Sequence, residues 1–301
     1  FSDTAEGQAY LSELMDHEAA LMEANPDRYS DLSAVQSANM LTAINKRIRV
    51  KKSRRLYWQV AAALIPLILV VGLTIRLNSQ VNLFGKTVYS EVNVPKGKQE
   101  HIIFQDGSEA YLNSDTRLRY PRKFGLSKRE IFLQGEGYFN IATNKRRPFI
   151  VRINNTDVTV LGTSFNVHAF KEDNEMKILL DKGSIVFNTP QNSYQILPGQ
   201  QAVYDVLTGK CVIDYVDKPY EVSVWKDNIV LFRDTPLADV IKTLNRRYNV
   251  EFAILNPKAL TYTYTLTTNQ TSLENIVKEL EKIAPVKFSI RKDNSIIVSL
   301  K

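Results

Sequence analysis

The sequence predicts a multi-domain chain with an N-terminal α-helical arm, one transmembrane helix, an all-β domain and a C-terminal α+β domain. Three observations carry this prediction. Residues 56–75 form an apolar run without a charge, residues 87–215 have the pattern of short alternating strands, and residues 225–301 alternate between strand and helix patterns. The arm is expected to occupy residues 1–55.

The arm is predicted to contain two helices. Apolar residues recur at helical spacing until Asn25-Pro26 breaks the pattern, and a second helix is expected to begin near Asp31 or Ser33. Two short helices cannot close a core unaided. The chain starts at Phe1 rather than methionine, which suggests a preceding segment, and we expect the two helices to need that segment or a partner.

The apolar run Leu56–Ile75 is long enough to cross a membrane. At a rise of ~1.5 Å per residue, a helix of this length spans roughly 30 Å, the thickness of the hydrocarbon core. Pro66 is tolerable because neighbouring groups can satisfy a freed carbonyl, and Gln59 lies near one end of the run. A buried core helix is the alternative, but strand patterns dominate the later part of the chain.

The charges beside this run predict its orientation. Seven basic residues precede it without an acid, whereas Arg76 and Lys86 stand nearly alone after it. By the positive-inside rule, the arm faces the cytoplasm and the later domains face the periplasm. A cleaved signal peptide is excluded, because about fifty polar residues precede the run and no small-residue cleavage site follows it. The topology signal consists of Lys46, Arg47, Arg49, Lys51, Lys52, Arg54 and Arg55.

Charge is divided unevenly along the chain. The formal net charge is +7, which the seven basic residues of the topology signal equal on their own. Residues 1–45 carry eight acids against Arg28 and have a net charge of −7, whereas residues 56–301 carry +7. The basic run is therefore interpreted as a topology signal that contacts lipid headgroups, and no direct binding of nucleic acid is expected. Cys211 is the only cysteine, which excludes a disulfide-stapled ectodomain.

Residues 87–215 are predicted to form an all-β domain. Short alternating segments such as EHIIFQ and REIFLQ are separated by Gly, Pro and Asp turns, and no helical pattern lies between them. A segment of about 130 residues can bury a core of its own. The pattern does not separate a sandwich from a solenoid.

Residues 225–301 are predicted to form a small α+β domain in the order β-α-β-β-α-β, with one added strand. The helices are expected at Pro236–Tyr248, after Asp234 or Thr235, and at Ser272–Ala284, with Thr271 or Ser272 as the cap. Each helix has one apolar face. We therefore expect both helices to cover one face of a single small sheet, and the two halves resemble a weak internal duplication.

The chain is predicted not to be an enzyme, and neither a metal nor a cofactor is expected. Its three histidines, His17, His101 and His168, occur in separate contexts, and none has metal-ligand spacing to another histidine or to the cysteine. No phosphate-binding loop, dinucleotide fingerprint or nucleophile elbow appears. Gly135-Glu136-Gly137 is interpreted as a strand turn, because it lacks a strand-to-helix setting.

One dipeptide, Gly162-Thr163, could support chemistry on the chain itself. A β-hydroxyl after a glycine can attack the preceding carbonyl in a strained turn, and hydrolysis of the resulting ester cuts the backbone once. Glycine helps because it admits the required φ and ψ angles. The plain alternative is a glycine bend followed by an ordinary strand threonine.

Five segments in the middle of the chain follow one another in the order of a known family. They are VPKGKQEHIIFQDGSEAYLNSDTRLRYP (Val94–Pro121), REIFLQGEGYFNI (Arg129–Ile141), RPFIVRI, VTVLGTSFNVHAF and LPGQQAVYD (Leu197–Asp205). In these segments the middle of the chain resembles the FecR family of single-pass anti-sigma regulators. The C-terminal domain is similar to the secretin and TonB short N-terminal domain, and together the two resemblances cover most of the chain after the apolar run.

The resemblance implies partners on both sides of the membrane. The arm would bind an extracytoplasmic-function sigma factor, and the periplasmic part would sense the signalling domain of a TonB-dependent outer-membrane transporter. Some members cut themselves at a Gly-Thr bond that Gly162-Thr163 matches, after which envelope proteases release the arm. The family's sigma-binding domain is longer than the arm present here.

In this interpretation the acids of the arm meet the basic surface of the sigma factor, while apolar side chains anchor the contact. The candidate sigma-binding residues are Leu11, Leu14, Leu21, Met22, Glu13, Asp16 and Glu18.

The sequence thus predicts a single-pass anti-sigma factor of the bacterial inner membrane that controls transcription of uptake genes. We expect the transporter's domain to add a strand at an edge formed by Ser295–Leu300. Two alternatives remain. An envelope protein that binds a periplasmic ligand or a cell-wall polymer would have a dispensable arm, and an envelope protease would need a catalytic constellation that the sequence does not offer.

Overall fold

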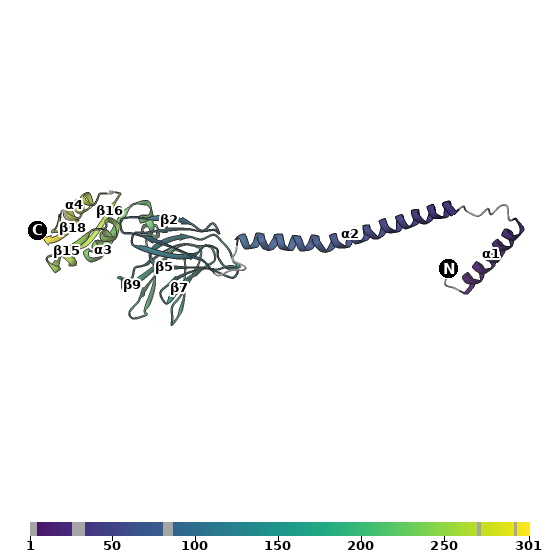
Figure 1. The fold of residues 1–301 in the computed structure, drawn as a ribbon. Helices are drawn as coiled ribbons and strands as arrows, with labels where there is room; N and C mark the ends of the chain where they lie inside the picture. The colour runs from purple at the N-terminus through teal and green to yellow at the C-terminus, as the bar shows by residue number, and fades with distance from the viewer. Residues whose placement is uncertain (1–4, 26–33, 81–86, 270–271, 292–293) are drawn as a thin grey trace. The chain divides into compact units, whose positions relative to one another are not determined.

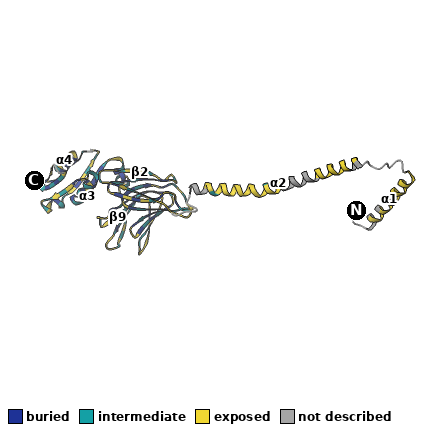
Figure 2. Ribbon diagram, in the orientation of Figure 1, coloured by how far each residue is buried: buried dark blue, intermediate teal, exposed yellow. Residues whose placement is uncertain are grey.

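The computed structural model describes residues 5–25, 34–80, 87–269, 272–291 and 294–301 (Figure 1). The chain divides into two compact units, residues 1–73 and residues 74–301, which are described separately. Buried residues are concentrated in the second unit, whereas the helices of the first unit are exposed (Figure 2).

The first unit is helical. Helix α1 spans Ala5–Ala24, and helix α2 spans Ala34–Gln80, so α2 begins in this unit and extends beyond it. The predicted N-terminal helices and the predicted apolar helix are all present. The second arm helix and the apolar segment are, however, one continuous helix. The physical reason is that residues 34–65 contain neither glycine nor proline, and lysine and arginine favour helix.

The segment Tyr57–Arg76 of α2 is long and apolar enough to cross a membrane, and none of it is buried in the protein. Its large side chains are widely exposed, as Trp58 at 76% and Leu69 at 67% illustrate. A surface of this kind requires an apolar environment or a partner. Pro66 lies inside the helix without ending it.

After the end of α2, the second unit contains the β-rich domain that the strand patterns predicted. Its thirteen strands form two facing sheets that share the long strand β5 and a single apolar core, so the domain is a sandwich. The strands are β1 (Tyr89–Val94), β2 (Glu100–Ile103), β3 (Glu109–Leu112), β4 (Thr116–Pro121), β5 (Arg129–Asn140), β6 (Phe149–Ile153), β7 (Thr156–Val160), β8 (Ser164–Ala169), β9 (Glu175–Lys182), β10 (Ile185–Asn188), β11 (Ser193–Ile196), β12 (Gln200–Asp205) and β13 (Cys211–Tyr215).

Strand β5 passes from one sheet to the other at Gly135. Its first half pairs with β4 and β6, and its second half pairs with β3 and β8. Gly135 has φ +113°, and a Cβ there would lie 2.5 Å from Thr116 Oγ1, so this corner requires glycine. From the start of β5, Arg129 Nη1 donates to the carbonyl oxygen of Ala142 at 2.8 Å, which joins the two facing halves.

Different loops and turns lie at the two ends of the sandwich. At the proximal end, where the chain enters the domain, the Arg122 amide donates to the Val88 carbonyl at 2.9 Å. The loop after β5 lies there too, since the Asn144 amide donates to the Leu161 carbonyl at 2.7 Å. At the far end lie the β5 corner at Gly135, the segment after β8 and the turn after β12.

The 3₁₀ helix η2 (Pro219–Asp227) leads into the C-terminal α+β domain. Its strands form two sheets: β14 pairs with β16, and β18 lies between β15 and β17. Helices α3 and α4 contact strands of both sheets, so the expectation of a single sheet with one covered face is wrong. The elements are β14 (Val230–Pro236), α3 (Leu237–Tyr248), β15 (Glu251–Ile254), η3 (Pro257–Thr261), β16 (Thr263–Thr268), α4 (Leu273–Ile283), β17 (Val286–Ile290) and β18 (Ser295–Leu300).

Two further expectations about this domain are wrong. Strand β18 is parallel to β15 on one side and antiparallel to β17 on the other, so Ser295–Leu300 is a central strand and not a docking edge. Helix α3 begins at Leu237 rather than at Pro236, because β14 continues through Pro236. Thr235 does not cap the helix, since its Oγ1 accepts the Arg233 amide at 3.0 Å instead.

Candidate functional site

The candidate site is the interface between the far end of the sandwich and helix α3. The loop between β1 and β2 covers the C-terminal end of α3: the Gly97 amide donates to the Arg246 carbonyl at 2.8 Å, and Lys96 Nζ donates to Asn245 Oδ1 at 2.6 Å. Carbonyl groups at a helix C-terminus lack partners inside the helix, and the helix dipole favours a cation there. The loop therefore ties this helix end to the β domain.

Arg246 projects from α3 towards the sandwich and is only 7% exposed. Its guanidinium carbon lies 3.8 Å from the centre of the Phe170 ring. Arg246 Nη1 donates to Glu172 Oε1 at 2.9 Å and lies 3.4 Å from Asp173 Oδ2. Lys242, one turn earlier on α3, donates to Asp173 Oδ1 at 2.8 Å. Two cations of one helix thus hold the carboxylate that follows β8.

His168 on β8 continues this network into the sandwich. Its Nε2 lies 3.1 Å from Asp173 Oδ2, and its Nδ1 lies 3.5 Å from Glu136 Oε1. Because both ring nitrogens face carboxylate oxygens, the doubly protonated imidazolium fits this position best.

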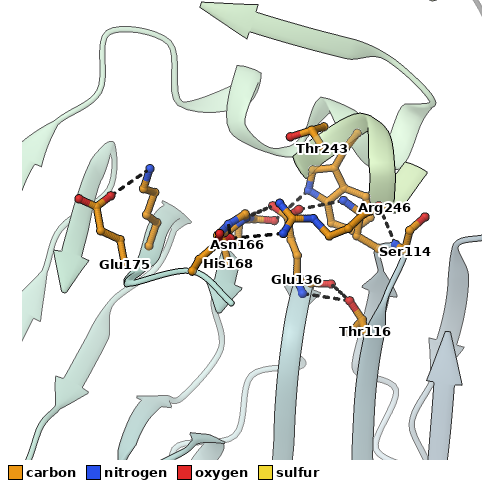
Figure 3. A network of polar contacts seen from close by, with 12 residues as sticks. Ser114, Thr116, Glu136, Asn166, His168, Glu175, Thr243 and Arg246 are labelled. Carbon is orange, nitrogen blue, oxygen red and sulfur yellow. Dashed lines mark hydrogen bonds and ion pairs between the residues drawn. The ribbon is translucent and has the colours of Figure 1, made fainter. Parts of the chain in front are cut away.

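Glu136, directly after the β5 corner, ends the network. Its carboxylate accepts hydrogen bonds from Asn113 Nδ2 at 2.8 Å and from Asn166 Nδ2 at 3.1 Å. Trp225 of η2 donates from Nε1 to Asn166 Oδ1 at 3.2 Å and so joins the linker to the same group. Figure 3 shows the side chains of Glu136, Asn166 and His168 converging towards Arg246.

The charges of this network keep one another ionised. Burial opposes the charge of His168, but the carboxylates of Glu136 and Asp173 outweigh it and raise the pKa of the imidazole to about 9. Burial also opposes ionisation of Glu136, yet the imidazolium and the two asparagine amides lower its pKa below the usual value. The pKa of Asp173 is lowered in the same way against burial, by His168, Lys242 and Arg246.

This arrangement can act as a coupling element. A cavity of about 180 Å³ lies beside it, lined by Glu136, His168, Trp225 and Arg246 among others. Removing one member of a buried ion pair leaves the other charge unpaired, which typically costs roughly 3–5 kcal/mol. A movement of α3 relative to the sandwich therefore has to break several of these contacts together.

The sequence did not predict this network. From the sequence alone, His168 is an isolated histidine, Glu136 is part of a strand turn, and Arg246 has no predicted role. The members come from β5, β8, the following segment and α3, so their spacing along the chain has no pattern. The one signal in the sequence is that polar and apolar side chains alternate along β8. Asn166 and His168 lie on the face opposite to the core residues Phe165 and Val167.

The dipeptide Gly162-Thr163 lies between β7 and β8, away from this network. A Cβ on Gly162 would collide with Thr143, so close packing requires glycine there. Thr163 is buried, and its hydroxyl donates to the Ser184 carbonyl at 3.0 Å. The carbonyls on either side of Gly162 accept amides of the loop after β5 at 2.7 and 2.9 Å. The dipeptide is thus held in one geometry from both sides.

The candidate sigma-binding residues lie on α1. At 100° per residue their four apolar members fall within roughly 100° of one helix face. The side chain of Leu11 lies outside the described residues. The exposed candidates are Leu14, Leu21, Met22, Glu13, Asp16 and Glu18.

The topology signal lies within α2. Lys46 and Arg47 are exposed. The side chains outside the described residues are those of Arg49, Lys51, Lys52, Arg54 and Arg55.

Comparisons with known proteins agree with this architecture. The family model described as FecR protein matches residues 90–185, within the sandwich, and the model described as FecR, C-terminal, matches residues 229–298. No curated protein matches the chain.

Two crystal structures of a protein from Parabacteroides distasonis ATCC 8503, described as a candidate anti-sigma factor, are similar to this chain. The structure at 1.65 Å resolution is 28% identical with a TM-score of 0.65, and the match covers 70% of this chain and 99% of that one. The structure at 2.50 Å resolution has the same identity and TM-score, and the match covers 71% of this chain and 100% of that one.

The raised pKa of His168 predicts a dependence of stability on pH. The imidazolium stabilises the fold fully below its ordinary pKa of about 6.5, and this contribution is lost as the pH rises through about 9. We expect the free energy of unfolding of residues 87–301 to fall between pH 7 and pH 10 by up to about 3 kcal/mol more in the wild type than in His168→Gln. Urea unfolding at each pH measures this difference.

The matched control is His101→Gln, which removes an exposed histidine of β2. This variant should keep the wild-type slope. Parallel pH profiles for the wild type and His168→Gln would contradict the assignment of a charged His168.

Proposed function

Because this chain belongs to the FecR family of anti-sigma factors, we propose that it spans the bacterial inner membrane once and relays a periplasmic signal to a sigma factor in the cytoplasm. The signal comes from a TonB-dependent outer-membrane transporter, and the sigma factor is of the extracytoplasmic-function class. Uptake genes are transcribed when the relay releases that factor. The basic run before the apolar segment and the net charge of −7 on residues 1–45 support the cytoplasmic location of the arm.

The observation that carries this proposal is the polar network at the far end of the sandwich. A relay requires that an event at the C-terminal domain reaches the β domain. Arg246 and Lys242 of α3 hold Asp173, and His168 connects Asp173 to Glu136 on β5. A shift of α3 that follows binding of the transporter's domain would therefore act directly on the strand that links the two sheets.

The relay predicts that Arg246→Ala separates inhibition from signalling. In cells that carry the transporter, the sigma factor and a reporter gene, the uninduced reporter should stay low, because the arm is intact. Induction by the transported compound should fall by about tenfold or more, because removal of one partner of a buried ion pair, which typically costs roughly 3–5 kcal/mol, removes the coupling.

The control for this experiment is Arg247→Ala, the next residue on α3. Arg247 Nη2 donates to the Asn228 carbonyl at 2.7 Å and does not contact Asp173 in the described structure. Induction should be unchanged in this variant at equal protein level on a blot. Full induction in Arg246→Ala would exclude the network as the signalling path.

The arm supplies the sigma-binding surface in this proposal. Exposed Leu14, Leu21 and Met22 form the apolar part of one face of α1. Exposed acids on the same helix add charge complementary to a surface that binds DNA phosphates. Affinity should therefore depend on both the apolar face and the ionic strength.

The variant Leu14→Asp with Leu21→Asp tests the arm. Titration of the full chain in detergent micelles with the cognate sigma factor should give binding that weakens by about tenfold or more in this variant, because two apolar contacts of roughly 1 kcal/mol each are replaced by charges. Wild-type binding should also weaken as salt is raised. Met40→Asp on α2 is the control, and equal affinities of all three proteins would contradict the assignment.

We also propose that the chain cuts itself once at Gly162-Thr163. Thr163 Oγ would bond to the Gly162 carbonyl carbon as the peptide C–N bond breaks, and the Oγ proton passes to the released amine. Water then hydrolyses the ester to a Gly162 carboxylate and the free Thr163 hydroxyl. The close packing on both sides of this bond supports a fixed geometry, and envelope proteases would trim the product.

A blot of the purified residues 87–301 tests this step. Wild type and Thr163→Ser, which keeps a β-hydroxyl, should each give two fragments, whereas Thr163→Ala should remain intact because the nucleophile is gone. An intact wild-type chain, or cleavage of Thr163→Ala, would show that no such attack occurs. Either result leaves sigma binding by the arm unaffected.

A further inference from the structure

We propose that the proximal end of the sandwich binds the anionic phospholipid surface of the membrane that anchors the chain. This inference rests on the proposed membrane anchor, and it adds a second contact between the protein and the same bilayer. The contact would be made by two loops that approach each other at this end, residues 122–128 and residues 144–147.

Strand pairing brings these two loops together at the point where the chain enters the domain. The first loop begins at Arg122, whose amide donates to the Val88 carbonyl at 2.9 Å. The first loop ends before Arg129 and the second before Pro148, and the Arg129 amide donates to the Pro148 carbonyl at 2.8 Å. Both loops are therefore adjacent to the segment that leads back to α2.

The loops combine exposed cations with an exposed apolar side chain. Arg122, Lys123, Lys145 and Arg146 are all exposed. Leu126, near the tip of the first loop, is 60% exposed. Cations next to a protruding apolar residue are typical of a surface that meets charged headgroups and inserts a side chain at the acyl boundary.

The acids near this end do not cancel the positive charge of the loops, because two of them pair with local cations and the third, Asp181, contributes a single negative charge. Asp106 pairs with the buried Arg129 at 2.7 Å. Glu130 pairs with Lys128 at 2.9 Å and with Arg152 at 3.0 Å. Asp181 accepts a hydrogen bond from the Tyr138 hydroxyl at 2.9 Å. The exposed side chains of Arg122, Lys145 and Arg146 thus leave a net positive surface.

The length of the connecting chain supports a membrane as the occupant. Seven residues lie between Gln80, the end of α2, and Val88, so eight Cα-to-Cα steps join the two. At ~3.5 Å per residue they reach at most about 28 Å, so a sandwich that follows a membrane helix stays near the bilayer surface. At that distance the local concentration of lipid headgroups is high, and weak individual contacts suffice.

The test uses the full chain in lipid nanodiscs with an environment-sensitive dye on Leu126→Cys, in a Cys211→Ser background. Nanodiscs of phosphatidylcholine are compared with nanodiscs in which about a third of the lipid is phosphatidylglycerol. We expect a blue-shifted, brighter dye emission in the anionic nanodiscs only. Each basic side chain should contribute about fivefold to the equilibrium, so reversal of all four charges (R122E, K123E, K145E, R146E) should abolish the shift.

The matched control is the dye on Leu207→Cys at the far end. Leu207 is 77% exposed, and the neighbouring Val206 amide donates to the Asn174 carbonyl at 2.8 Å, beside the polar network. Its emission should be the same in both lipids. Circular dichroism of the charge-reversed protein should match the wild type, because the four side chains are exposed.

Other outcomes would overturn the proposal. Equal emission of the dye on Leu126→Cys in both lipids, or a shift that survives reversal of the four charges, excludes electrostatic binding to anionic lipid. A shift that appears only after addition of the transporter's signalling domain would assign this end to a protein partner. Failure of the chain to enter nanodiscs would instead refute the proposed anchor itself, so the two failures are distinguishable.

Discussion

The unit formed by residues 74–301 depends on a largely buried row of alternating charges that runs from helix α3 to strand β5. Arg246 and Lys242 face Asp173, Asp173 faces His168, and His168 faces Glu136. The side chains of Asp173, His168 and Glu136 are largely removed from water, so each is costly as a charge without its neighbour. Because these charges need their partners, the row fixes the position of the C-terminal domain on the sandwich.

Polar contacts of this kind constrain direction as well as distance. An apolar interface tolerates sliding, whereas the guanidinium of Arg246 has to stack on Phe170 and meet two carboxylates at once. The linker takes part too, because Trp225 donates to the amide that holds Glu136. A displacement of α3 consequently changes the ion pairs that the charged residues of the β domain make.

Strand β5 connects the two ends of the sandwich. The corner at Gly135 places Glu136 in the polar network, and the strand ends at Asn140, directly before Ile141, whose amide donates to the Thr163 carbonyl at 2.9 Å. Five residue-to-residue steps of extended chain, roughly 17 Å, lead from Glu136 to Ile141. One continuous piece of backbone thus joins the network at the far end to the Gly162-Thr163 bond at the proximal end.

The sequence by itself determined the N-terminal helices, the apolar helix and the β-rich domain, because helical and strand periodicities are local properties of the chain. It did not determine which strands pair: β18 became a central strand, and two small sheets replaced the expected one. For the charge network it offered only the alternation of side chains along β8, because the members Glu136 and Arg246 stand more than a hundred positions apart. Only the tertiary structure decided these features, since the free energy of a buried charge depends on the groups that folding places around it.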